Sequence, residues 1–237
     1  MSTNKVIIRW TIGTVSRQGA KCLKHSVKSF VDCYGQNFDF YICYNSIEKP
    51  VLNLDIDLKY IYQDKPILQG TGGIWKYTPA RIDISKKELF IDNDIVFISK
   101  NQKLLNFFEN DKFLLARDNV RYYGRFDNLF DADELLNAGL IGFPCNYDLG
   151  NEIKKLWVKL GSLPDIDSSE EQGLVAYLIK TQPDYMMLND KDIVILNGYG
   201  DTFNIFGNEW LTHDTYHFVE LNRKYHKYYQ RRMIKLI

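Results

Sequence analysis

The chain has 237 residues, of which 45% are hydrophobic and 25% charged, a composition that excludes disordered and fibrous proteins. Its 30 basic residues balance 30 acidic residues, so no net field attracts the molecule to nucleic acid, and we expect no nucleic-acid partner. This length suits one large α/β domain or two small ones.

The first part of the chain alternates between strand and helix patterns. A β-branched run at 6–12 predicts a strand, and the polar segment 13–19 predicts a loop after it. Residues 20–34 carry apolar side chains at helical spacing, and the apolar run 38–44 predicts a second strand that ends at Asn45. Two strands separated by a helix indicate a parallel βαβ unit.

The middle of the chain continues this alternation. Residues 58–62 predict a third strand, and we expect a helix from about 74 to 82, although Pro79 lies inside it. The apolar runs 88–91 and 95–98 predict two further strands, with a short acidic segment between them.

The second half predicts further elements of both kinds: strands at 112–116, 137–144 and 193–196, and helices at 147–160 and 169–180. Residues 119–134 are polar and aromatic without a period, so we expect a long loop over a binding site. A Gly- and Asn-rich stretch at 197–208 leads to His213, His217 and a basic end. No repeat or linker divides the chain, so we predict a single domain over 1–237.

The strongest chemical signal is the acidic segment Asp92-Asn93-Asp94. Two carboxylates at the end of an apolar strand lie where open α/β sheets bind their ligands. Burial of neighbouring carboxylates is costly without a cation, and Mg²⁺ or Mn²⁺ prefers such oxygens together with substrate phosphates. The alternative is a solvated turn, but the apolar residues on both sides would bury it. The segment therefore predicts a divalent-metal site for a phosphorylated substrate.

Two enzyme families carry such a motif. Asp92-Asn-Asp94-Ile-Val96 resembles the motif of haloacid-dehalogenase-like phosphatases, in which the first Asp, here Asp92, attacks phosphorus. In that family the motif lies on the first strand, whereas here about ninety residues precede it. In GT-A glycosyltransferases the Asp-x-Asp lies mid-chain, after a nucleotide-binding βαβ half, as it does in this sequence.

Other segments resemble GT-A glycosyltransferases of the glycogenin and galactosyltransferase type. They occur in the family's order: the basic segment Trp75–Arg81, the strand Glu88–Asp94, Asn137-Ala-Gly139, the acidic Glu170-Glu-Gln172 at a helix start, and the late His217. The resemblance implies a single GT-A domain of the α/β class with a Rossmann-like, mostly parallel central sheet. It implies a nucleotide-binding half at about 1–98, and an acceptor half with a basic tail at about 99–237.

The resemblance also implies roles for individual residues. Asp92, Asp94 and His217 would bind Mn²⁺ or Mg²⁺. Because only three residues separate His213 from His217, His213 is the alternative ligand. Glu171 would be the acceptor-side base if the enzyme inverts, with Gln172 and Asn137 beside it. The residues implied in nucleotide-sugar binding are Thr11, Gly13, Arg17, Asn45, Lys76, Arg81, Asp92, Asn93 and Arg223. The family's Gly and Lys segment after the late His, which contacts the diphosphate, is replaced here by Glu220-Leu-Asn-Arg223, so we expect Arg223 or Lys224 to make that contact.

We therefore expect a metal-dependent glycosyltransferase that uses a nucleotide sugar, a UDP-sugar first, and a glycan or lipid-linked acceptor, as in polysaccharide biosynthesis. A phosphatase with Asp92 as nucleophile and an inactive sugar-binding GT-A module are the alternatives. No apolar run is long enough to cross a bilayer and no signal peptide is evident, so we expect a cytoplasmic protein. The basic segment 223–237 could contact anionic lipid at the inner face of the membrane.

Overall fold

The computed structural model describes residues 5–13, 17–45, 48–63, 74–161, 166, 168–196 and 213–218. Its main feature is a seven-stranded sheet in the order β3-β2-β1-β4-β7-β6-β8. The strands are β1 (Ile7–Ile12), β2 (Asp39–Tyr44), β3 (Leu58–Tyr62), β4 (Glu88–Asp92), β6 (Phe113–Arg117), β7 (Leu136–Phe143) and β8 (Tyr185–Leu188). Only β7 runs antiparallel to its neighbours. The predicted α/β fold with a mostly parallel sheet is confirmed.

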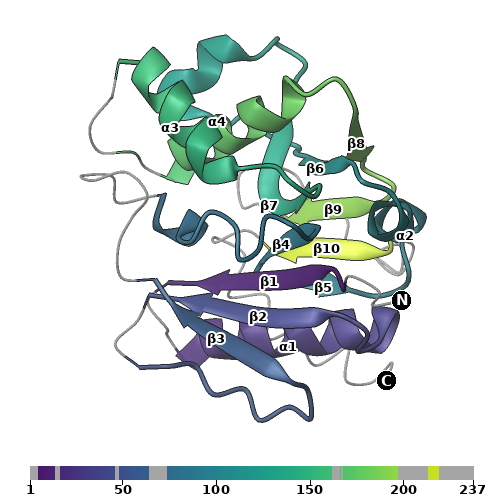
Figure 1. Ribbon diagram of the computed structural model, residues 1–237. Helices are drawn as coiled ribbons and strands as arrows, with labels where there is room; N and C mark the ends of the chain where they lie inside the picture. The colour runs from purple at the N-terminus through teal and green to yellow at the C-terminus, as the bar shows by residue number, and fades with distance from the viewer. Residues whose placement is uncertain are drawn as a thin grey trace.

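A smaller three-stranded sheet adjoins the first one (Figure 1). Its central strand is β10 (Thr215–Phe218), which runs antiparallel to β5 (Ile95–Phe97) and parallel to β9 (Ile193–Leu196). Because β5 follows β4 after only two residues, the small sheet begins at the C-terminal end of β4.

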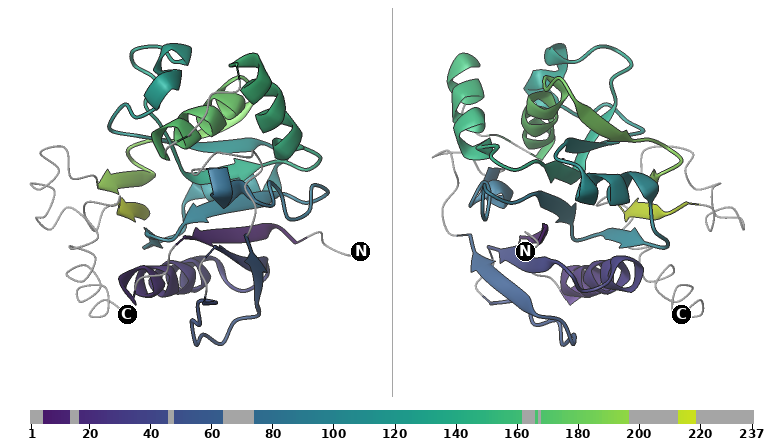
Figure 2. Two further views of the ribbon diagram at one scale, coloured as in Figure 1. Left: turned by 90° about the vertical axis from the view of Figure 1, so that its left-hand side faces the viewer. Right: turned by 45° about the vertical axis from the view of Figure 1, so that its right-hand side comes forward.

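Helices cover both faces of the large sheet (Figure 2). One face packs against α1 (Arg17–Tyr34) and α2 (Gln102–Glu109), and the other against α3 (Leu149–Lys159), α4 (Ser168–Lys180) and the 3₁₀ helix η2 (Gly124–Leu129). Side chains of β1 alternate between the two faces: Ile8 and Trp10 pack in the core beneath α1, whereas Arg9 and Thr11 lie on the opposite face. Burial on two faces explains why the strands read as nearly continuous apolar runs.

Several elements differ from the sequence prediction. Residues 74–82 do not form a helix: a single 3₁₀ turn, η1 (Ile74–Tyr77), is followed by irregular chain, because Pro79 has no N–H for a helical hydrogen bond. The long loop predicted at 119–134 contains η2. Helix α2 and strands β8 and β10 were not predicted. The division into halves at about residue 98 stays a prediction.

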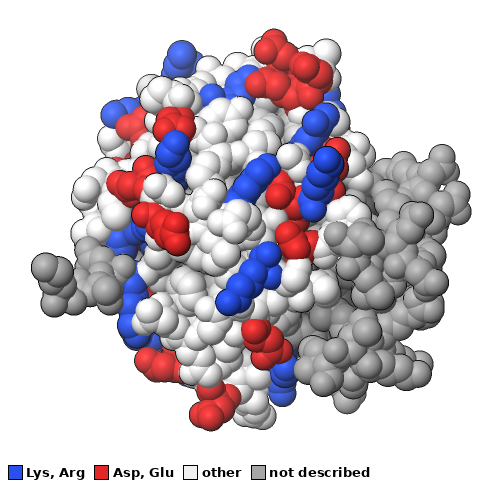
Figure 3. All heavy atoms as spheres, turned by 90° about the vertical axis from the view of Figure 1, so that its right-hand side faces the viewer, with Lys and Arg blue, Asp and Glu red and all other residues white. Residues whose placement is uncertain are grey.

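The described surface carries charges of both signs. Figure 3 shows Lys and Arg side chains interspersed with Asp and Glu over one face. Pairs such as Lys103–Asp192, at 2.7 Å, and Lys112–Asp184, at 2.8 Å, neutralise each other locally. Among the helices in the described ranges, none combines the length and apolar character required to cross a bilayer.

Candidate active site

The Asp-x-Asp motif lies where the two sheets diverge. Asp92 is the last residue of β4 and Asp94 directly precedes β5, so the turn leads the chain from the large sheet into the small one. Asp94 is buried and Asp92 is half-buried. Phe218 donates its backbone N–H to the carbonyl of Asp94 at 3.0 Å, which attaches β10 to the turn. Both carboxylates therefore lie at the C-terminal end of a parallel strand, where open α/β sheets bind ligands.

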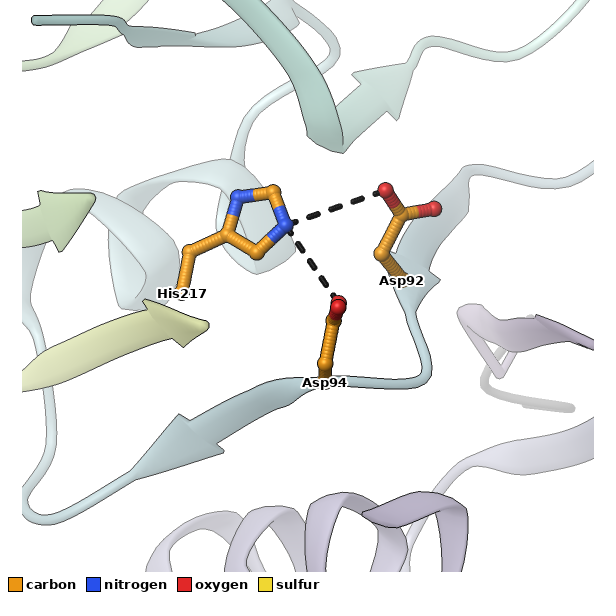
Figure 4. A group of neighbouring side chains, drawn as sticks. All are labelled: Asp92, Asp94 and His217. Atoms are coloured by element: carbon orange, nitrogen blue, oxygen red, sulfur yellow. Dashed lines mark ion pairs between the residues drawn. The ribbon is translucent and has the colours of Figure 1, made fainter. Parts of the chain in front are cut away.

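His217 reaches this turn from a distant part of the chain. It lies on β10, opposite Ile95 of β5 and Ile195 of β9. Its Nε2 lies 3.4 Å from Asp94 Oδ1 and 3.9 Å from Asp92 Oδ2 (Figure 4). The structure thus brings together the three side chains that the sequence analysis assigned to a metal.

Room for the imidazole ring comes from Gly139 on β7. A Cβ atom at this position would lie well inside van der Waals contact of His217 Cε1. Asn137 Oδ1 accepts the backbone N–H of Gly139 at 2.8 Å and fixes the strand at this point. The Asn-x-Gly segment noted in the sequence therefore shapes the space that the histidine occupies.

The Asp92–Asp94–His217 cluster has the donor atoms and spacing of a divalent-cation site. One ligand atom from each residue lies within 4.8 Å of the other two. Mg²⁺ binds oxygen at about 2.0–2.1 Å in octahedral geometry, so its ligand atoms lie about 3 to 4 Å from one another. A buried and a half-buried carboxylate this close repel each other unless positive charge compensates them. The residues therefore fit a divalent cation.

Protonation of His217 would supply part of that positive charge. Burial disfavours the charged imidazole, but the hydrogen bond to Asp94 and the charges of Asp94, Asp92 and Asp118 raise the pKa of His217 above its ordinary value. An imidazole that binds a metal must be neutral, so protonation of His217 and binding of a cation compete with each other.

Lys76 lies in the 3₁₀ turn η1, and its side chain bridges two carboxylates. Its Nζ lies 2.9 Å from Glu171 Oε1 and 3.5 Å from Asp92 Oδ1. Burial disfavours the ammonium, but the charges of Asp92 and Glu171 raise the pKa of Lys76 well above its ordinary value. Burial raises the pKa of Glu171 to about 7, although Lys76 opposes the shift. Glu171 therefore changes its charge near neutral pH.

The two glutamates at the start of α4 face different parts of the protein. Glu171 turns toward Lys76 and the Asp-x-Asp turn. Glu170 binds Arg125 of η2, through the guanidinium Nε and through Nη2 at 2.9 Å. The ion pair of Glu170 with Arg125 therefore links η2 to α4. Glu171 is the glutamate that lies at the site.

Asp118 organises the other two residues that the sequence placed on the acceptor side. Its Oδ2 accepts hydrogen bonds from Asn137 Nδ2 at 2.9 Å and from Gln172 Nε2 at 3.4 Å. Gln172 Oε1 in turn accepts the N–H of Ala138 at 3.2 Å. No role for Asp118 was predicted from the sequence. Its position directly after an apolar strand, like that of Asp92, was the signal that could have identified it.

The residues predicted near the base and ribose lie at the same end of the sheet. Thr11 pairs with Asp92 across β1 and β4, and Gly13 follows β1. Asn45, which directly follows β2, donates its backbone N–H to the carbonyl of Ile12 at 3.3 Å. In addition, the Nδ2 of Asn93 donates to the carbonyl of residue 19 at 3.4 Å, which links the Asp-x-Asp turn to α1.

Some of the predicted residues lie outside the part of the chain that the structure describes. Arg223 and Lys224 are among them, and although Arg17 begins α1, its side chain is not described. His213 precedes β10, with its ring centroid 6.0 Å from that of Tyr216, and does not belong to the Asp92–Asp94–His217 cluster.

The assignment of Arg81 to donor binding requires correction. Its Nε lies 3.1 Å from Glu88 Oε2, at the opposite end of β4 from Asp92. Its remaining donors reach backbone carbonyls, those of Pro144, Tyr147 and Lys86. These contacts bury the Arg81 guanidinium at the Glu88 end of β4, away from the Asp92 end.

No protein-family model and no curated protein sequence matches the chain. Solved structures do share its fold. The galactosyltransferase LgtC, in complex with donor and acceptor sugar analogs, has a TM-score of 0.61 and 11% identity over 90% of this chain and 87% of its own. Mouse xyloside xylosyltransferase 1 has a TM-score of 0.55 and 10% identity over 92% and 98%. GlyE of Streptococcus pneumoniae has a TM-score of 0.56 and 14% identity over 94% of this chain and 56% of its own. The chain has the fold of GT-A glycosyltransferases.

Proposed function

We propose that this protein is a metal-dependent glycosyltransferase that moves a sugar from a nucleotide-sugar donor to a glycan or lipid-linked acceptor. The observation that carries the proposal is the Asp92–Asp94–His217 cluster at the C-terminal end of the central strand β4, in a fold that occurs in glycosyltransferases. We propose a UDP-sugar as donor. We propose Mn²⁺ ahead of Mg²⁺ because one of the three ligands is an imidazole.

The cation would be held by the two carboxylates and the imidazole of the cluster. When bound, it neutralises the negative charge that develops on the leaving nucleoside diphosphate. The two oxygens of Asp92 face different partners: Oδ1 faces the Lys76 ammonium, and Oδ2 faces His217. Lys76 therefore adds a fixed positive charge beside the proposed diphosphate position.

On the acceptor side, Glu171 is our candidate for the base that takes the proton of the attacking hydroxyl, if the reaction inverts the anomeric centre. A base whose pKa lies near the working pH is efficient, and the pKa of about 7 meets that condition. Asn137 and Gln172 are held in fixed orientations by Asp118, and we propose that their amides bind sugar hydroxyls.

We propose the remaining donor contacts for residues near the C-terminal ends of β1, β2 and β4, at the start of α1 and in the basic tail. These residues are Thr11, Gly13, Arg17, Asn45, Asn93 and Arg223. Residues with small or polar side chains after parallel strands are common around bound nucleotides. A peripheral membrane contact through residues 223–237, a cytoplasmic location and a role in polysaccharide biosynthesis belong to the same proposal.

Two LgtC structures support a site for both sugars. One contains donor and acceptor sugar analogs, and the other carries a glutamine-to-glutamate substitution in the active site. These facts concern LgtC alone. For this protein they support the search for a donor and an acceptor sugar, and they make Gln172 a residue to test.

The phosphatase alternative fits less well. It requires Asp92 on the first strand of its fold and free to attack phosphorus, whereas Asp92 ends β4 and contacts Lys76. An inactive sugar-binding module would not need the complete Asp92–Asp94–His217 cluster, which favours the enzyme.

A thermal-shift screen with UDP, GDP and CMP, each with and without Mn²⁺, tests the proposal. A ligand at a hundred times its Kd stabilises the folded state by about 2.7 kcal/mol, which raises Tm by on the order of 5 °C in a chain of this size. We expect this shift for one nucleotide, only with Mn²⁺, and turnover of the corresponding nucleotide sugar.

Asp94→Asn is the decisive variant, because an amide cannot replace an anionic metal ligand. We expect it to remove the nucleotide-dependent shift and nearly all transfer while Tm without ligand stays close to wild type. Asp184→Asn, which changes a surface carboxyl paired with Lys112, is the matched control. Transfer at the wild-type rate by Asp94→Asn at ordinary Mn²⁺ concentrations would refute the metal assignment.

A further inference from the structure

The position of Lys76 is not explained by its own secondary structure. It belongs to η1, a single turn of 3₁₀ helix, and the irregular segment 78–82 follows it. A long, flexible side chain on such a segment loses considerable rotamer freedom when its ammonium is held between Asp92 and Glu171. Some other part of the protein must fix the backbone that carries it.

That backbone is held by a buried arginine of β1. Arg9 Nη2 donates to the carbonyl of Lys76 at 2.7 Å, and Nη1 donates to the carbonyl of Pro79 at 2.6 Å. Gln63, just after β3, adds a second donor to the Lys76 carbonyl at 3.1 Å. Two carbonyls three residues apart are therefore bound by one planar guanidinium.

Arg9 is itself fixed in the core. Its Nη1 lies 3.4 Å from Glu88 Oε1, and its guanidinium carbon lies 4.3 Å from the centre of the Phe90 ring. The side chains of Arg9 and Glu88 are both fully buried. A buried ion pair is seldom more stable than well-packed apolar residues of similar size, so its value lies elsewhere.

We propose that Arg9 is a positioning residue that holds the Lys76 ammonium between Asp92 and Glu171. Arg9 lies on the same face of the sheet as Asp92, since it pairs with Phe90 across β1 and β4 and Thr11 pairs with Asp92. It acts through the Lys76 carbonyl and does not touch the cluster. Its catalytic consequence rests on the function proposed above.

The chain offers a matched control in Arg81. Like Arg9, this arginine is buried and binds the carboxylate of Glu88, through the other oxygen. Its backbone partners are the carbonyls of Pro144, Tyr147 and Lys86, and none of these is the carbonyl of Lys76. Arg81 therefore shares the structural role of Arg9 without the connection to Lys76.

The first experiment measures the accessibility of the Lys76 amine, which needs no substrate. Wild type, Arg9→Lys and Arg81→Lys are treated briefly with acetic anhydride, and acetylation of Lys76 is quantified by peptide mass spectrometry relative to exposed Lys24. Lysine keeps the charge but cannot span two carbonyls. We expect Lys76 to react about tenfold faster in Arg9→Lys, a change of the size expected from the loss of a charge-assisted hydrogen bond. In Arg81→Lys the rate should stay within about twofold of wild type.

An equal rise in both variants, or no rise in Arg9→Lys, would overturn the proposal, because either result means that Arg9 only stabilises the core. Gln63→Leu covers the case in which Arg9→Lys does not fold. It removes a donor to the Lys76 carbonyl without touching the buried ion pair, and we expect a smaller rise in the same direction. No rise in that variant would count against the proposal.

The second experiment links Arg9 to transfer. If Arg9 acts through Lys76, the double variant Arg9→Lys/Lys76→Met should have the same kcat as Lys76→Met alone, whereas Arg81→Lys should combine additively with Lys76→Met. Additive losses for Arg9→Lys would contradict the positioning role. If wild type transfers no sugar from any donor, the proposed function fails, while the acetylation result still decides what Arg9 does.

Discussion

The positive and negative charges of the side chains at the C-terminal end of β4 nearly balance. Three carboxylates and two basic groups meet there: Asp92, Asp94, Glu171, Lys76 and His217. If all were charged, the group would keep one negative charge in a mostly buried place, which is costly. With His217 neutral, a divalent cation brings the group to formal neutrality. The same residues that repel without a cation are therefore suited to binding one.

His217 should influence which cation is bound. We expect His217→Ala to weaken Mn²⁺ binding by about tenfold or more and to reduce the preference for Mn²⁺ over Mg²⁺, because only oxygen ligands remain. Isothermal titration of each cation in the presence of UDP measures both effects. His213→Ala, on the segment before β10, is the control. An unchanged cation preference in His217→Ala would make His217 a structural residue.

Glu171 should make the stability of the cation-free protein depend on pH. Its pKa is about 7 when folded and close to 4.5 when unfolded, so between these values the folded state retains a proton that the unfolded state releases. The contribution of Glu171 to the free energy of unfolding is unaffected below pH 4.5 and falls by about 3 kcal/mol as the pH rises to 7 and above.

Urea denaturation from pH 4.5 to 8 in the presence of a chelator measures this effect. We expect Glu171→Gln to lack the decline, so that its stability relative to wild type increases with pH. Glu109→Gln, which alters an exposed carboxyl of α2, controls for the loss of one charge. Parallel pH profiles for wild type and Glu171→Gln would contradict the prediction.

At the scale of elements, strand β7 contacts both the candidate site and the hydrophobic core through glycines. Two of its glycines leave space for different neighbours: a Cβ at Gly139 would collide with His217, and a Cβ at Gly142 would collide with Phe107 of α2. Neither substitution can be made without movement of a neighbouring ring.

The two glycine variants should therefore fail differently. Crowding a packed site costs typically 1–3 kcal/mol, and we expect a loss of this order in both Gly139→Ala and Gly142→Ala. Only Gly139→Ala should also weaken Mn²⁺ binding, by about tenfold or more, because it displaces the imidazole. Chemical denaturation and cation titration of both variants test this. Equal Mn²⁺ affinities would show that the glycine serves packing alone.

Regular elements were predictable from the sequence where local chemistry decides them. The strands that end at Ile12, Tyr44 and Asp92 follow from β-branched and apolar runs, since a sheet buried on both faces needs them. The helix expected at 74–82 was wrong because tertiary contacts and Pro79 determine that segment. Strand β10 was missed because its four residues are ordered by partners about twenty and one hundred and twenty residues away.

At the scale of the whole molecule, the site joins segments that are remote in sequence. It draws on β4, η1, α4, β7 and β10, of which β10 enters the small sheet between β5 and β9. The cluster residues themselves were identifiable from the sequence because paired carboxylates and a late histidine form a recognisable pattern. Asp118 had only its position after an apolar strand as a signal, and Arg9 had none, since the importance of Arg9 depends on hydrogen bonds that only the fold creates.

Cation binding should therefore stabilise β10 in particular. We expect Mn²⁺ to slow hydrogen–deuterium exchange about tenfold in peptides covering 92–97 and 213–218, because the cation ties His217 to the Asp-x-Asp turn. Peptides from β3, at the far edge of the large sheet, should exchange at an unchanged rate. The experiment repeated with Asp94→Asn should show no protection. Uniform slowing across the molecule would mean that the cation acts elsewhere.

The late position of His217 has a consequence for the protein during its own synthesis. Residues 94 and 217 are separated by about half of the chain, so a ribosome that has just completed β4 and β5 still has β10 to translate. At about 5–20 residues per second this takes on the order of ten seconds. Throughout that interval the nascent chain carries Asp92 and Asp94 without His217, so the proposed cation site is complete only after β10 has been translated.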